Sequence, residues 1–215
     1  MINKGKNRDH AHKACIGAGT GMGKAALMWN NGAKRYIPIA SEGGHSDCSG
    51  QSAADIRLFE FIKNITKQET VSWENVLSGS GIQYIYQFLG TERAYPETEM
   101  SKEIAEHRFE PDKISLFSKE DLRCNDTFLL YARFYARCAK NFVLDVLALN
   151  GIYIAGGIAA KNISVFHNPV FMEEFKKNGK HSKLLSEVPV YVIADYTISL
   201  YGAFEFMRLH DQNIL

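Results

Sequence analysis

Residues 13–40 read KACIGAGTGMGKAALMWNNGAKRYIPIA, and they decide how the chain enters its fold. Apolar residues alternate partly along the runs on either side of Asn31 and Gly32. This dipeptide suits the positive φ angles of a tight hairpin turn. The first run is itself interrupted by a glycine-rich turn that holds Thr20. The stretch therefore predicts successive β-strands joined by short turns.

The glycine-rich turn, GAGTGMGK at residues 17–24, has the spacing of neither common phosphate-binding loop. A dinucleotide loop needs a glycine three positions after Gly19, where Met22 stands. A P-loop would need glycine at Ala18 and serine or threonine at Ala25. Backbone N–H groups of a glycine-rich turn can still contact a phosphate closely. A plain hairpin turn is the alternative, but one or two glycines would serve it and this turn has four.

Helical and strand patterns follow in an order typical of a mixed α/β fold. Ser52 and Asp55 have the spacing of a helix start. The runs at 151–158, GIYIAGGI, and at 189–194, PVYVIA, predict buried strands. The helical patterns cover residues 52–65, 72–78, 82–89 and 128–150, a stretch after Pro169, and residues 199–210. Residues 79–82 are expected to break the second helix, and Gly151 is expected to end the longest one. Residues 91–119 are expected to combine a loop with a short helix. This order indicates an α/β fold with a mixed sheet.

Composition excludes several classes of protein. The chain has 215 residues, 46% of them apolar, which suits one sizeable domain or two small ones. Lysine and arginine number 25 against 24 acidic residues, so no basic field would attract nucleic acid. No apolar run approaches the roughly 20 residues of a membrane span, and the first residues lack the apolar core of a signal peptide. The cysteines form no C-x-x-C pair and are expected to be reduced thiols: Cys15, Cys48, Cys124 and Cys138. We therefore expect a cytoplasmic protein without nucleic-acid or membrane partners.

Residues 1–12 are polar and are expected to form a flexible leader before the domain at residues 13–215. Asp9, His10 and His12 could in principle hold a metal ion, but a solvated tail is the preferred interpretation.

A second conspicuous turn, SEGGHSDCSG, occupies residues 41–50. Two glycines separate Glu42 from His45, so both side chains can lean over one small ligand. A carboxylate accepts hydrogen bonds and a neutral imidazole donates one and accepts one, which suits a polyol such as a sugar. A metal site through Glu42, His45 and Asp47 and a turn without a ligand are the alternatives.

Gly156 and Gly157 end the buried strand at 151–155. Ligands of open α/β sheets bind beyond the carboxyl ends of the strands, so this pair is a candidate wall of a nucleotide pocket. An ordinary glycine exit from a strand would look the same.

The order of these motifs resembles the bacterial glucokinase family of the hexokinase and actin-like ATPase superfamily. GAGTGMG, SEGGHSD, SWENVLSGSG at 72–81, GIYIAGGI and PVYVI follow one another over nearly the whole chain after residue 12. The resemblance implies the large domain of an actin-like ATPase (ribonuclease H-like) fold, a mixed sheet flanked by helices. It also implies ATP-dependent phosphorylation of glucose to glucose 6-phosphate, at the start of glycolysis, with Mg²⁺.

The same resemblance implies roles for single residues. Glu42, His45 and Glu74 correspond to glucose ligands. Gly19, Thr20 and Gly21 correspond to a phosphate loop, and Gly156 and Gly157 to the adenosine motif. The family's N-P-G-L-L-G is represented only by residues 198–202, ISLYG, so that wall of the nucleotide pocket departs from the pattern.

The family's smaller N-terminal domain, with its D-x-G-G-T loop and the N-D-F aspartate that acts as general base, has no counterpart before Lys13. The chain thus looks like the C-terminal large domain alone: a truncated gene product, half of a split enzyme or an engineered fragment. Asn125 and Asp126 look superficially like N-D-F, but we interpret them as helix caps. We therefore expect no catalytic base and little or no activity. A non-catalytic sugar-binding or regulatory protein is the alternative.

The expected partners are glucose and either a second copy or the missing domain. The apolar helix at 128–150 and the aromatic side chains of Tyr84 and Tyr86, expected to be exposed, favour a homodimer.

Overall fold

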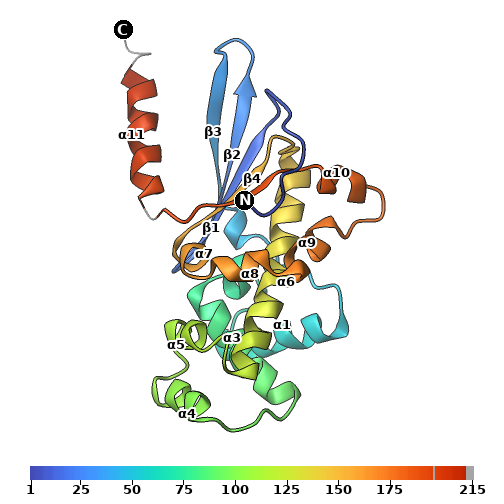
Figure 1. The fold of residues 1–215 in the computed structure, drawn as a ribbon, viewed down its shortest axis with the longest axis vertical. Coiled ribbons are helices and arrows are strands. Elements are labelled where there is room, and N and C mark those ends of the chain that lie inside the picture. Colours follow the sequence, from blue (N-terminus) through green and yellow to red (C-terminus); the bar gives the residue numbers. More distant parts are fainter. Residues whose placement is uncertain (196, 212–215) are drawn as a thin grey trace.

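One mixed sheet organises the chain in the computed structural model, which describes residues 1–195 and 197–211 (Figure 1). The strands are β1 (Lys13–Ala18), β2 (Met22–Asn30), β3 (Arg35–Ser41), β4 (Ile152–Ala155) and β5 (Val190–Val192). Their order in the sheet is β3-β2-β1-β4-β5. The first three strands are antiparallel, whereas β4 and β5 run parallel to β1. The predicted mixed sheet is confirmed.

The hairpin between β2 and β3 has a longer turn than the sequence predicted. Asn30 pairs with Arg35, which leaves a four-residue loop at 31–34 instead of a two-residue Asn-Gly turn. The Asn30 side chain accepts a hydrogen bond from the Ala33 N–H at 2.8 Å, and the positive φ falls on Lys34 (51°). A side-chain cap thus replaces the backbone geometry that Gly32 was expected to supply.

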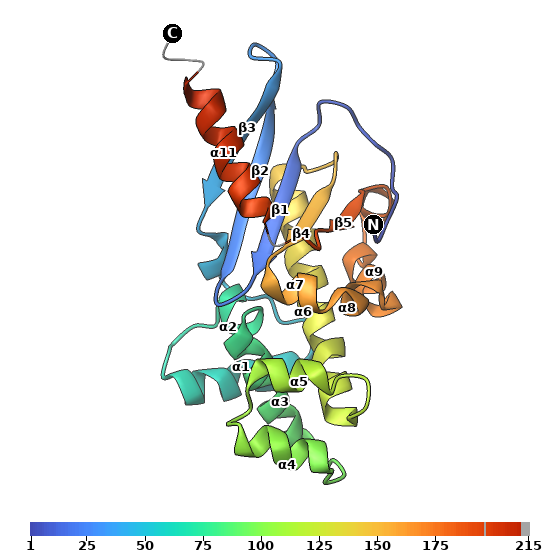
Figure 2. The same ribbon diagram turned by 60° about the vertical axis from the view of Figure 1, so that its left-hand side comes forward.

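The helices gather mainly in the middle and at the end of the chain. Their bounds are η1 (Gly43–His45), α1 (Ala53–Thr66), α2 (Trp73–Val76), α3 (Gly79–Glu92), α4 (Glu99–Glu106), α5 (Pro111–Leu116), α6 (Leu122–Val146), α7 (Gly157–Lys161), α8 (Ile163–His167), α9 (Pro169–Lys176), α10 (Ser182–Ser186) and α11 (Ile198–Asp211). Helices α1, α3, α4 and α5 lie beyond the end of the sheet that carries the β1–β2 turn (Figures 1 and 2).

Helix boundaries correct four predictions. Residues 79–82 open α3 instead of breaking a helix, because the Ser78 hydroxyl accepts from the Gly81 N–H. Helix α6 begins at Leu122, where Asp121 caps it by accepting from the Cys124 N–H at 2.9 Å. It ends at Leu147 in a left-handed conformation, before Gly151 is reached. Residues 91–119 contain two helices, α4 and α5, where one was expected.

Helix α6 forms the centre of the core. It packs against β1, α3 and α9. Its completely buried aromatic side chains, Tyr131, Phe134 and Tyr135, share the core with Ala14 and Ile16 of β1. All four cysteines are free, and burial raises the pKa of each thiol, as expected for unreactive reduced side chains.

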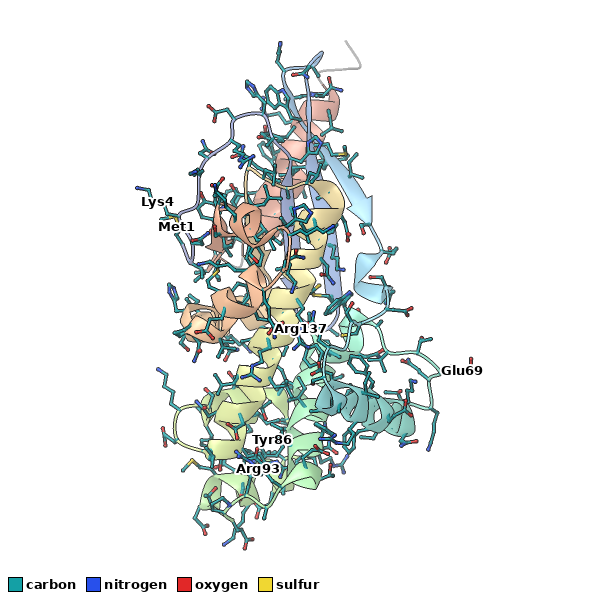
Figure 3. All side chains as sticks on the ribbon, turned by 90° about the vertical axis from the view of Figure 1, so that its right-hand side faces the viewer. Met1, Lys4, Glu69, Tyr86, Arg93 and Arg137 are labelled. Atoms are coloured by element: carbon teal, nitrogen blue, oxygen red, sulfur yellow. The ribbon has the colours of Figure 1, made fainter. Side chains whose placement is uncertain are left out.

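A buried charge network joins α6 to two other helices. The Arg137 side chain, 7% exposed, donates to Asp55 Oδ2 of α1 at 2.8 Å and to Glu174 Oε1 of α9 at 2.9 Å. The same Asp55 oxygen accepts from the backbone N–H groups of Gln51 and Ser52, at 2.8 and 3.0 Å, which completes the predicted capping box of α1. Arg137 lies at the middle of the molecule, where the sheet half meets the helical half (Figure 3).

The segment at 1–12, expected to be a flexible leader, makes specific contacts with the β5 region. The backbone N–H groups of Ile2 and Asn3 donate to Val190 O, at 2.8 and 3.2 Å. Lys6 and Arg8 both pair with Glu187.

The two histidines of this segment lie against β2. His10 stacks on the Trp29 ring, and His12 Nδ1 accepts from the Trp29 N–H at 3.2 Å. Across the described residues, no three His, Cys, Asp or Glu side chains are grouped so as to hold a metal ion.

Helix α11 exposes most of its apolar side chains. It lies beside the β2–β3 hairpin, on the side of the sheet away from α6 (Figures 1 and 2). Its large exposed apolar side chains are Ile198, Leu200, Tyr201, Phe204, Phe206 and Met207. The exposed aromatic surface predicted at Tyr84 and Tyr86 is wrong, because Tyr86 is 1% exposed and Tyr84 packs against the core. Within the described residues, no helix has both the length and the apolar character that crossing a membrane requires.

We predict that Arg137→Met lowers the free energy of unfolding by about 3–5 kcal/mol, because it leaves Asp55 and Glu174 buried without their cation. Urea unfolding followed by circular dichroism measures the change. Arg133→Met, one helical turn earlier at an exposed position, is the matched control and should stay within about 0.5 kcal/mol of the wild type. An Arg137→Met variant as stable as the control would contradict the assigned role.

Candidate functional site

The turn after β3 lies directly on the start of β2. At Gly44, a Cβ atom would lie 1.8 Å from Met22 O, so only glycine permits this approach. The turn closes as a short 3₁₀ helix, in which the His45 N–H donates to Glu42 O at 2.9 Å. The side chains of Glu42 and His45 therefore leave the turn close together.

Helix α2 brings a second carboxylate to this turn. The Trp73 N–H donates to Ser46 O at 3.0 Å, and the Cys48 N–H donates to Val71 O at 2.8 Å. These bonds fix Glu74 beside the β1–β2 turn, where its Oε2 accepts from the Met22 N–H at 2.9 Å. A Cβ atom on Gly21 would lie 2.5 Å from that oxygen, so the absence of a side chain makes room for the carboxylate.

The three predicted sugar ligands form one cluster. His45 Nε2 lies 3.9 Å from Glu42 Oε2, and His45 Nδ1 lies 4.0 Å from Glu74 Oε1. Their side chains are 93% (Glu42), 61% (His45) and 34% (Glu74) exposed, so all three remain accessible. Two carboxylate acceptors on either side of an imidazole can bind several hydroxyl groups of one ligand.

A cavity of about 450 Å³ begins at the β1–β2 turn and extends between α5 and α7. Gly19 and Thr20 line it at the turn, and Gly157 lines it at the start of α7. Gly21 and Gly156, also predicted to bind the nucleotide, do not line it. Gly156 has a supporting role: its φ is 94°, and a Cβ atom would lie 2.4 Å from Ala18 O, so glycine lets β4 leave the sheet against the end of β1.

Sequence reasoning missed the far wall of this cavity, which Glu110, Pro111, Asp112 and Ser115 contribute from the start of α5. That stretch was expected to combine a loop with one short helix. Pro111 at the first position of α5 was the available signal, because proline is favoured there.

Asp126 and residues 198–202, both considered for the site on sequence grounds, lie away from the cluster and the cavity. Asp126 is neither a cap nor part of the cluster: it follows the true cap Asp121 by five positions and accepts from Arg93 and from Tyr95 Oη. Arg93 lies near the end of the molecule opposite the sheet (Figure 3). Residues 198–202 form the start of α11, and none of them lines the cavity.

Comparison with known proteins agrees with this architecture. A family model described as Glucokinase matches residues 1–210. The glucokinase of Nostoc sp. is 31% identical over 215 residues, which cover 94% of this chain and 62% of that protein. The glucokinase of Synechocystis sp. is 33% identical over 205 residues, which cover 88% of this chain and 57% of that protein.

Solved structures show the same fold. A crystal structure of glucokinase from an Antarctic psychrotroph superposes with a TM-score of 0.76 at 26% identity, over 94% of this chain and 59% of that chain. Glucokinase from Balamuthia mandrillaris in complex with glucose superposes with a TM-score of 0.69 over 86% of this chain and 50% of that one; its 21% identity supports the fold alone.

The fold is thus that of the actin-like sugar kinases, as the sequence predicted. More specifically, the chain belongs to the glucokinase family. It spans about 60% of the length of the curated relatives that it matches.

The close approach of Gly21 to Glu74 gives a direct test of the site's geometry. We predict that Gly21→Ala displaces the Glu74 carboxylate from the Met22 N–H and lowers stability by no more than about 1 kcal/mol, because only a flexible side-chain end must move. Hydrogen exchange followed by NMR tests this: the Met22 amide should lose protection in Gly21→Ala as it does in Glu74→Gln. Gly23→Ala, whose Cβ meets nothing within 4 Å, should keep that protection. Unchanged protection of the Met22 amide in Gly21→Ala would refute the contact.

Proposed function

We propose that this chain binds glucose through Glu42, His45 and Glu74 and contributes part of the ATP site in the phosphorylation of glucose to glucose 6-phosphate. The observation that supports it best is the convergence of these three side chains from two distant segments, with Glu74 bonded to the same turn that opens into the cavity. The chain then corresponds to the C-terminal large domain of a glucokinase.

On the nucleotide side, Gly19, Thr20 and Gly157 support phosphate binding, because all three line one cavity near the glucose cluster. Its volume, about 450 Å³, falls within the range of small-molecule sites. The Gly19 N–H is already bonded to Gly21 O at 2.9 Å, so the phosphate contacts fall to the rest of the turn. Gly21 and Gly156 act indirectly, by giving room to Glu74 and to the exit of β4.

The described residues lack a cluster that would hold magnesium by itself. In kinases, magnesium is commonly bound through one or two carboxylates together with the substrate phosphates.

In the reaction, this chain's residues would orient the sugar, and the two carboxylates would fix its hydroxyl groups by accepting hydrogen bonds. The proton of the attacking hydroxyl needs a base. Neither carboxylate suits that role if it binds the sugar, and Asp126 is held by Arg93 and Tyr95 away from the cluster. We therefore place the base in a part of the enzyme that this chain does not supply.

A sugar-binding protein without catalysis would use the same cluster. Glucose binding that neither ATP nor a supplied N-terminal domain converts into product would favour it. The expected second copy or added domain stays a prediction; α11 offers the exposed apolar side chains that such a partner would cover.

We predict that Glu42→Gln and Glu74→Gln each weaken glucose binding by about 1.5–3 kcal/mol, the scale of a hydrogen bond to a charged group. Isothermal titration with glucose measures the loss. Glu69→Gln removes an exposed carboxylate outside the cluster and should bind as the wild type does. A chelator should leave the affinity unchanged. Wild-type affinity in both site variants would defeat the assignment.

We also predict little or no glucose 6-phosphate from this chain alone at saturating ATP and magnesium. General-base catalysis contributes about 10²–10⁴-fold, and the closing of two domains around the substrates contributes further. A coupled assay measures the product, and an N-terminal glucokinase domain added in trans or fused should restore turnover. Rapid turnover by the chain alone, abolished by Asp126→Asn, would place the base here and overturn the proposal.

A further inference from the structure

The polar side chains of the nucleotide cavity are mostly bonded to one another. Lys161 Nζ donates to both carboxylate oxygens of Asp112, at 2.9 and 3.1 Å, and links α7 to α5. Ser115 Oγ donates to Asn162 Oδ1 at 2.5 Å, and Asn162 Nδ2 donates to Ile158 O at 3.0 Å. These bonds join the two walls of the cavity, so each of these groups already has a protein partner.

Glu110 differs from the other side chains of this wall. It occupies the N-cap position of α5, yet its carboxylate makes no capping bond, and it has no hydrogen bond or ion pair to any described residue. Its backbone, in contrast, is fixed: the N–H donates to His107 O at 3.2 Å, and the carbonyl accepts from Lys113 and Ile114 at 3.1 and 3.2 Å. Glu110 thus lines the cavity on a fixed backbone, and its carboxylate is solvent-exposed and without a partner among the described residues.

The chain reaches Glu110 through an unusual backbone. Arg108 and Phe109 have φ angles of 53° and 61°, a left-handed conformation that non-glycine residues rarely adopt twice in succession. Bonds from Gln83 Nε2 to Arg108 O and from the Phe109 N–H to Ile104 O, both 2.8 Å, impose it. Such strain concentrates at ligand-binding positions. Here its effect is to set where α5 begins and hence where Glu110 stands.

We propose that Glu110 is a specificity-determining residue, whose carboxylate accepts hydrogen bonds from the nucleoside part of the bound nucleotide. The proposal rests on the proposed nucleotide site. With phosphates at Gly19 and Thr20, the nucleoside occupies the part of the cavity between α5 and α7. The apolar side chains of Ile82, Pro111 and Ile158 there suit a flat base, and Glu110 supplies the acceptor. A nucleoside offers matching donors in its ribose 2′-hydroxyl and its exocyclic amine.

Isothermal titration of the full chain tests this with three probes: ATP, 2′-deoxy-ATP and the triphosphate of purine riboside, which lacks the amine. We expect the wild type to bind ATP about tenfold more tightly than one of the two analogues, and the weaker analogue identifies the donor. Glu110→Ala should bind all three equally, at the weaker affinity. Glu110→Gln should keep part of the preference, because its amide oxygen still accepts.

Glu106→Ala is the matched control, because it removes an exposed carboxylate at the end of α4, outside the cavity, and should keep the wild-type preference. A wild type that binds all three probes equally, or a Glu110→Ala variant that keeps the preference, would overturn the role of Glu110 and leave the nucleotide site standing. A wild type that binds glucose but none of the probes would overturn the nucleotide site and this inference with it.

Discussion

The buried contact between Arg137 and Asp55 ties together helices that lie far apart in the sequence. Asp55 caps α1 and binds Arg137 through the same oxygen, so the chain's exit from the 41–50 turn is coupled to the central helix. Glu174 extends the network to α9. Lys140, one turn further along α6, donates to backbone carbonyls of α9 and its C-cap, and burial lowers its pKa. Removing one member would leave the others buried and charged without a partner. The complete network is therefore more stable than any form that lacks one member.

On this framework, the candidate site depends on backbones that come unusually close. Gly44 lies against Met22 O, and Gly21 gives way to Glu74. As a result, the β1–β2 turn, the turn after β3 and helix α2 are in contact although they are far apart in the sequence. The proposed glucose cluster and the proposed nucleotide cavity then share the β1–β2 turn, which is the arrangement that transfer between two bound substrates would need.

The sequence was most informative where local chemistry decides the structure. The helix start at Ser52, the strands at β4 and β5, and the mixed sheet followed from capping residues and apolar runs. The convergence of Glu42, His45 and Glu74 was implied by family resemblance, since spacing alone does not reveal the bonds from Trp73 to Ser46 and from Glu74 to Met22. Errors arose where another local signal decides a helix end: Asp121 caps α6 in place of Asn125, and Leu147, in a left-handed conformation, ends it in place of Gly151. The wall at Glu110 was missed although Pro111 signals the start of α5, and no short-range pattern predicts the two left-handed residues that precede Glu110.

The contacts of residues 2 and 3 bear on how the sheet avoids unwanted association. The exposed edge of a sheet offers unpaired backbone groups to any other extended chain. At β5, Asn3 pairs with Val190 and its side chain bonds the carbonyls of Ser186 and Val188, so the chain covers its own edge. At the opposite edge, β3 carries Pro38, which has no N–H to offer a newcomer. A tag or fusion joined at Met1 would therefore lie next to the covered β5 edge. If it displaced residues 2 and 3, the exposed backbone groups of β5 could pair with another chain and promote aggregation.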